Sequence, residues 1–140
     1  MRCSKRWYSL ALASALLCGG AAQGQGMSDF GKREFDANCA SCHGLDGKGK
    51  GVLADFLRKP PPDLTTLTVR NEGVFPLSRL YDSIEGGSIA SHGTREMPVW
   101  GWEYRTQARG SFAESPYDTE AYVRVRILAL LEYLSRLQQR

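Results

Sequence analysis

The chain has few cysteines, few histidines and no apolar run long enough to cross a membrane. Its 140 residues include four cysteines and two histidines. The longest apolar run, Trp7–Cys18, falls short of the roughly 20 residues that a membrane-spanning helix needs. Cys3 and Cys18 both lie in the N-terminal segment, so only two cysteines remain beyond it. That number excludes a disulfide framework.

The N-terminal segment has the organisation of a secretory signal. Three basic residues precede the apolar run, and small residues suited to cleavage follow it at positions 20–22. We therefore expect residues 1–22 to be a cleaved signal peptide and residues 23–140 to form one domain in the periplasm. A retained membrane anchor and a lipid-modified Cys18 stay open as less favoured alternatives.

The chain also lacks a strong excess of charge. Its 18 Lys and Arg outnumber its 15 Asp and Glu, for a formal net charge of +3. Three of the basic residues and none of the acidic ones lie in the expected signal, so the charges of the remaining domain balance. No basic stripe is present, and we expect neither a nucleic-acid partner nor stable membrane insertion after cleavage.

The clearest motif is CASCH at residues 39–43. Two cysteines separated by two residues, with a histidine directly after the second, have the spacing that attaches a c-type haem. On a helical turn Cys39 and Cys42 project to the same side, where each thiol can form a thioether with a porphyrin vinyl group. The predicted cofactor is therefore one covalent haem c, with His43 as the proximal ligand of its iron.

Paired cysteines also occur in zinc sites, redox-active dithiols and disulfides. A structural zinc site needs four ligands, and beyond the signal only one further histidine, His92, is available. A thioredoxin-like pair belongs to a βαβ unit, and no strand-like run flanks the motif. A plain disulfide between Cys39 and Cys42 also stays open. We favour the haem interpretation over these three.

A sixth iron ligand is expected from a glycine-bearing loop that contains Met97 and Pro98. This loop can fold across the haem face opposite the histidine. Methionine often fills irregular space in a core, but the only other methionine of the expected domain, Met27, lies at its start. We therefore expect Met97 to be the distal axial ligand, with His92 as its rival.

Hydrophobic spacing predicts three main helices. The first begins near Ser28 and leads into the haem motif, the second covers Pro76–Glu85, and the third starts near Asp118. A short helix is expected within 52–58, whereas the stretch 103–118 shows no periodicity and is expected to be irregular. The third helix has an apolar stripe formed by Val123, Ile127, Leu130, Leu131, Leu134 and Leu137.

Two contacts follow from these elements. The apolar stripe of the last helix needs a partner surface, and the first helix offers one near Gly31 and Phe35. A histidine that ligates a metal usually donates its second ring N–H to a carbonyl or carboxylate. Because the chain is extended at its three consecutive prolines, we expect one carbonyl of residues 60–62 to accept that bond from His43.

With these residues considered, the chain resembles the class I c-type cytochromes, specifically the small bacterial single-haem members. The resemblance extends over nearly all of the chain beyond the signal. It is carried by Gly31, Phe35, the 39–43 motif, the proline segment, Met97-Pro98, Trp100-Gly101, Leu130 and Tyr133. It implies an all-α cytochrome c fold of three to five helices, with long loops wrapped around one covalently bound haem. It also implies that the first and last helices cross at right angles, with the glycine and an aromatic pair at the contact.

The expected function is one-electron transfer in the periplasm, by a carrier and not by an enzyme. Ligation by histidine and methionine fills both axial positions and raises the reduction potential. The expected partners are redox proteins, a donor dehydrogenase and an acceptor oxidase or cytochrome. Two alternatives stay open: an electron-accepting subunit of a periplasmic dehydrogenase complex, and a haem sensor or enzyme in which Met97 is displaceable.

Overall fold

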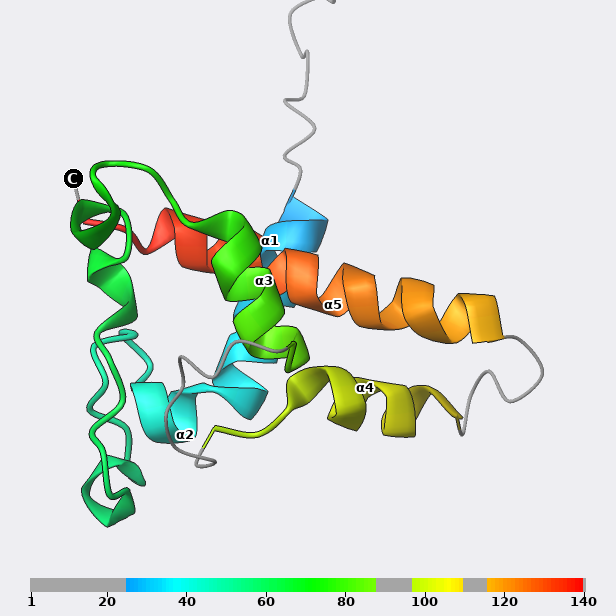
Figure 1. Cartoon of the computed structure of the whole chain (residues 1–140), viewed down its shortest axis with the longest axis horizontal. Coiled ribbons are helices and arrows are strands. Elements are labelled where there is room, and N and C mark those ends of the chain that lie inside the picture. Colours follow the sequence, from blue (N-terminus) through cyan, green and yellow to red (C-terminus); the bar gives the residue numbers. More distant parts are fainter. Residues whose placement is uncertain (1–24, 88–96, 110–115, 140) are drawn as a thin grey trace, which may run out of the picture.

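The computed structural model describes residues 25–87, 97–109 and 116–139. The expected signal peptide and the rival ligand His92 lie outside the described residues. In the described ranges the regular elements are all helical (Figure 1), which confirms the predicted all-α class. They are α1 (Gln25–Asn38), α2 (Ala40–His43), α3 (Leu77–Glu85), α4 (Trp100–Arg109) and α5 (Pro116–Arg136), with 3₁₀ turns at Ala54–Phe56, Leu64–Thr66 and Val69–Asn71.

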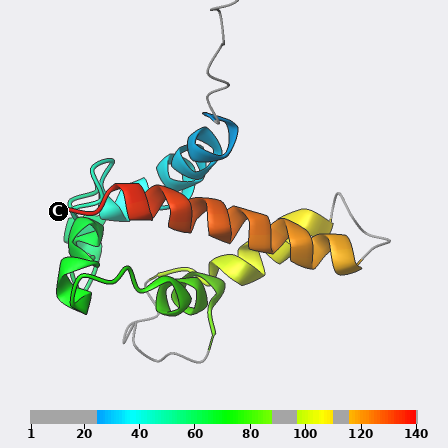
Figure 2. The ribbon, with the colours of Figure 1, turned by 90° about the horizontal axis from the view of Figure 1, so that it is seen from above.

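The core is built on α5, which packs against α1, α3 and α4. Figure 2 shows α1 crossing α5 near the middle of the molecule. The predicted apolar stripe of this helix is buried apart from Leu137, which is partly buried beside the same core. Because α5 contacts each of the other long helices, it is the element against which the rest of the fold is placed.

Gly31 allows α1 and α5 to approach each other closely. A Cβ atom added at Gly31 would lie 2.1 Å from the carbonyl oxygen of Ala129 and 3.1 Å from the Cβ of Tyr133. One turn further along α1, the rings of Phe35 and Tyr133 pack with their centroids 5.3 Å apart. The expected contact between the two helices, with the glycine and an aromatic pair in it, is confirmed.

The prediction that residues 103–118 are irregular is wrong. Most of this stretch belongs to α4 and to the start of α5. Tyr104 and Ala108, four residues apart, are buried on one face of α4, which packs against α5. Pro116 is the first residue of α5, a position where the missing N–H costs nothing.

The other expected boundaries are close to those observed. α3 begins one residue later than predicted and ends as expected, where Gly86 takes the left-handed conformation with φ of 91°. α1 begins at Gln25, before Ser28. The helix expected within 52–58 is reduced to the 3₁₀ turn at Ala54–Phe56. In the described part of the chain, no helix has the length and apolar character needed to span a membrane.

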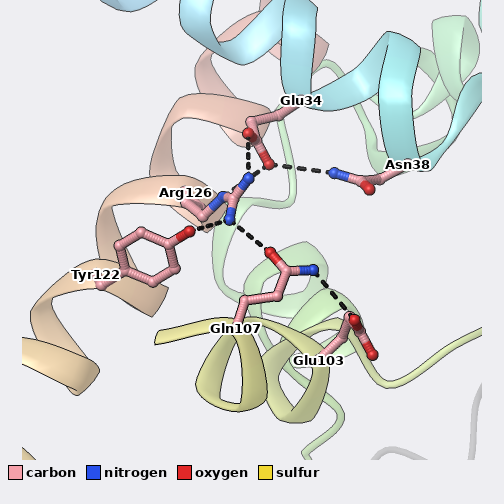
Figure 3. A network of polar contacts seen from close by, with 6 residues as sticks. All are labelled: Glu34, Asn38, Glu103, Gln107, Tyr122 and Arg126. Carbon is pink, nitrogen blue, oxygen red and sulfur yellow. Dashed lines mark hydrogen bonds and ion pairs between the residues drawn. The ribbon is translucent and has the colours of Figure 1, made fainter. Parts of the chain in front are cut away.

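A partly buried ion pair joins α1 and α5, and a hydrogen bond from Arg126 extends the network to α4 (Figure 3). Arg126 donates from Nε and Nη2 to the two carboxylate oxygens of Glu34, at 2.9 and 2.6 Å. Glu34 also accepts from Asn38 at 3.2 Å, and Arg126 donates to Gln107 of α4 at 2.8 Å and to the Tyr122 hydroxyl. Burial opposes the charge on Arg126, but its hydrogen bonds to Glu34 and its attraction to the charge of Glu34 together outweigh burial and raise the pKa of the guanidinium. The network fixes α4 against the other two helices.

Candidate functional site

One cavity of about 470 Å³ brings together the four residues that the sequence singled out. Cys39, Cys42, His43 and Met97 all line it, although Met97 lies more than fifty residues from the motif. Leucine, isoleucine, proline and aromatic side chains make up most of its remaining wall. The volume lies in the range of roughly 300–1,000 Å³ that is usual for sites binding small molecules or cofactors.

The haem motif is held rigidly although α2 has only four residues. It continues directly from α1, since the backbone N–H of Cys39 donates to Phe35 at 2.8 Å. The last carbonyls of a helix lack partners within the helix. Here the following loop supplies them: the N–H groups of Gly49, Gly51 and Leu53 donate to the carbonyls of His43, Cys42 and Ser41 at 2.7, 3.0 and 2.9 Å.

The glycines of this loop are explained by its close packing on α2. A Cβ atom added at Gly51 would lie 2.3 Å from the carbonyl oxygen of Ser41. A side chain at this position would therefore break the contact that brings the loop onto the motif. The glycine-rich sequence after His43 therefore wraps the end of α2 through its backbone, while the side chains between the glycines are exposed.

The ring of His43 is oriented by the proline segment, as predicted. Its Nδ1 lies 3.4 Å from the carbonyl oxygen of Pro62, which is a long hydrogen bond. When Nδ1–H donates to this carbonyl, the lone pair of the ring is on Nε2, the atom that can ligate a metal. The three prolines restrict their own backbone and thereby fix the position of the accepting oxygen.

Both thiols of the motif are free in this structure. Burial, with smaller contributions from Glu34 and Cys42, raises the pKa of the Cys39 thiol to about 12. Cys39 is therefore a neutral thiol near pH 7, whereas metal ligation and disulfide exchange both use the thiolate. In the described ranges, no group of three or more His, Cys, Asp or Glu side chains is arranged to hold a metal ion.

Met97 is positioned by the start of α4. It is partly buried against the core, and Pro98 and Trp100 line the cavity beside it. The Trp100 ring packs on Tyr104 with centroids 6.0 Å apart, and the guanidinium of Arg126 lies 4.7 Å from the centre of the Tyr104 ring. The partly buried ion pair thus supports the segment that carries Met97.

Sequence reasoning missed two groups of polar residues near this cavity. The first is the ion pair of Glu34 on α1 and Arg126 on α5. Each of these residues places a charge on a helix face that packs against the core, and the two charges have opposite sign. The second consists of Lys59, Arg70 and Arg79, which line the cavity, whereas no carboxylate does so among the described lining residues. Only the first group left a signal that the sequence could have revealed.

Residues 28–108 match the sequence model of the Cytochrome c family, which is more than half of the chain. The chain therefore belongs to the cytochrome c family, whose members bind haem covalently and transfer electrons. Comparison with curated proteins and with solved structures gave no match. The family match ends before α5, so it does not test the packing of α5 on α1.

The residues of the cavity fit a haem. A planar porphyrin needs apolar walls, two thiols close together at one edge and axial donors, and the cavity provides all three kinds of group. Imidazole nitrogen and thioether sulfur are both established iron ligands in cytochromes c. Cationic side chains in the lining suit a cofactor that carries two carboxylates.

Proposed function

We propose that the protein is a periplasmic one-electron carrier with a single haem c. In this proposal Cys39 and Cys42 attach the haem, and His43 and Met97 ligate its iron. The main observation in support of this proposal is that these four side chains line one largely apolar cavity. The pattern of the N-terminal segment supports export with cleavage after residue 22, and membership of the cytochrome c family supports electron transfer.

The roles of the side chains follow from their chemistry. Each thiol would add across one vinyl group of the haem, so that a sulfur–carbon bond forms and the thiol hydrogen goes to the other vinyl carbon, with no leaving group. Pro62 holds the imidazole of His43 in the tautomer that ligates through Nε2. When bound, the haem supplies an iron that alternates between the ferrous and ferric states.

A carrier is favoured over an enzyme because His43 and Met97 would each supply a donor to the iron of a bound haem. Met97 would then occupy the place that dioxygen, peroxide or a substrate would need. Thioether sulfur favours the reduced iron, which raises the potential relative to two nitrogen ligands. The apolar lining keeps water from the iron, so little solvent must reorganise when the electron moves.

A redox titration tests this function directly. We expect the purified holoprotein to show one reversible one-electron wave, with the same potential in the oxidative and reductive directions. One wave follows from one iron whose two ligands stay bound in both states. Two waves, or a potential that differs between the two directions, would contradict a single haem with fixed ligands.

We also propose that partners dock on the loop that wraps α2. This loop exposes Leu45, Val52 and Phe56, with 71, 82 and 83% of their surface accessible. Its residues 45–59 include four basic and two acidic side chains, and Lys48 and Lys50 are both exposed. Apolar contact ringed by positive charge suits an acidic redox protein, because complementary charges steer association. Electrons would then pass at the haem edge held by the thioethers.

Charge reversal at Lys48 and Lys50 tests this docking face. We expect Lys48→Glu with Lys50→Glu to slow electron transfer with an acidic partner about tenfold or more at low ionic strength, because steering changes association rates by 10–10³. The loss should shrink as salt screens the charges. The reversal of Arg109 and Arg124, which are exposed on α4 and α5, is the matched control. Equal slowing by both double variants would place the docking face elsewhere.

A further inference from the structure

The haem cavity has an uneven distribution of charge. Lys59, Arg70 and Arg79 line it, and its described lining residues include no Asp or Glu. All three are exposed, so their charged groups lie at the mouth and not in the apolar interior. A cavity whose charged lining residues are all cations favours a ligand that carries anionic groups at one edge.

Arg70 is held in place by its own backbone surroundings. Its Nη2 donates to the carbonyl oxygen of Asp63 at 2.6 Å, and its Nε lies 3.4 Å from that of Thr66. A guanidinium has five N–H groups, so donors remain for a further acceptor. The carboxylate of Asp63, which Arg70 also influences, is already engaged by the backbone N–H and the hydroxyl of Thr65 at 2.8 and 2.7 Å.

Arg79 approaches the cavity from a different element. It lies near the start of α3, the helix whose Leu80, Ser83 and Ile84 form part of the cavity wall. Within the described residues it has no ion-pair partner at 4.0 Å or less. Figure 1 shows the start of α3, the helix that contains Arg79, high in the view and α2 low in it.

The geometry of a porphyrin connects these observations. Its two vinyl groups lie on one side of the macrocycle and its two propionates on the other. A haem attached at α2 therefore directs its propionates away from the motif. We propose that Arg70 and Arg79 bind the two haem propionates, an inference that rests on the proposed attachment at Cys39 and Cys42. A carboxylate partly removed from water is costly unless it is paired, and arginine can pair with it through two hydrogen bonds.

The pH dependence of the reduction potential tests this assignment in the holoprotein. A nearby cation lowers the pKa of a carboxyl group by about 1–3 units. The potential falls with pH as the propionates lose their protons. Replacing Arg79 and Arg70 by glutamine should therefore move this fall to higher pH, by about one unit or more. The potential itself should also fall, because a cation near the haem disfavours the ferric state. Arg79→Lys with Arg70→Lys should restore most of the wild-type profile, because charge is retained.

Arg124→Gln is the matched control, since Arg124 is an exposed arginine of α5 that does not line the cavity. Its potential and pH profile should equal those of the wild type. A wild-type profile in the Arg70→Gln, Arg79→Gln variant, with the haem still bound, would overturn the assignment. Loss of haem from the wild-type protein into acid acetone is a different result, and it would overturn the attachment at the cysteines instead.

Discussion

Replacing Met97 by alanine is expected to convert a closed haem into one that binds carbon monoxide. Met97 lines the cavity that also holds His43. If Met97 is the proposed sixth ligand, alanine removes that donor from the iron. The reduced variant should bind carbon monoxide rapidly, whereas the wild type should not. The weak near-infrared band of iron–thioether bonding in the oxidised protein should be lost completely, and the potential should fall because the thioether favours ferrous iron.

His92→Ala is the control for this experiment, because His92 is the rival ligand in the same sequence segment. It should keep the near-infrared band and leave the reduced protein unreactive toward carbon monoxide. If His92→Ala removed the band and Met97→Ala did not, the distal ligand would have been misassigned. Rapid binding of carbon monoxide to the wild type would favour a sensor or an enzyme over a carrier.

A methyl group at Gly31 is expected to cause a large loss of stability. The added Cβ would lie 2.1 Å from the carbonyl oxygen of Ala129, an atom of the α5 backbone that cannot rotate away. The two helices must therefore separate along a contact that includes Phe35 and Tyr133. Overpacking of a core typically costs 1–3 kcal/mol, and we expect Gly31→Ala to cost about 3 kcal/mol or more.

Gly73→Ala provides a matched comparison, because it adds the same methyl group in open space. Nothing lies within 4 Å of the added Cβ there, but the glycine has a φ of 83°. The left-handed conformation alone should cost about 1–2 kcal/mol. Thermal unfolding of both holoproteins, monitored by circular dichroism, measures the difference. An equal loss in the two variants would mean that α1 and α5 can move apart at no cost in free energy. That result would contradict a contact at Gly31 too close for a side chain.

The haem motif and the main packing contact could be predicted from the sequence because each depends on local spacing. The thiols, the histidine and the following glycines lie within a few turns of chain, and their geometry follows from a single helical turn. The contact between Gly31 and α5 could be predicted from an apolar stripe that needed a partner. The carbonyl partner of His43 was predicted to within three prolines, and the structure identifies Pro62.

The residues that depend on tertiary placement could not be predicted in this way. α4 has only a weak apolar face, with Tyr104 and Ala108 as its buried members, so its periodicity was obscured by the neighbouring glycine and proline. Arg70 and Arg79 reach the cavity from separate elements, and nothing in their local sequence marks them. The charges at Glu34 and Arg126 could have been noticed, but their pairing requires knowledge of how α1 and α5 cross.

The most direct test of the account is the intact mass of the purified, exported protein together with extraction by acid acetone. The account predicts a chain that begins near residue 23, carries the added mass of one haem, and keeps its colour in the protein fraction. A Cys39→Ala, Cys42→Ala variant should release any bound haem into the organic phase. A wild-type protein with the mass of the polypeptide alone, whose colour passes into the acetone, would contradict covalent attachment at the cavity of Cys39, Cys42 and His43.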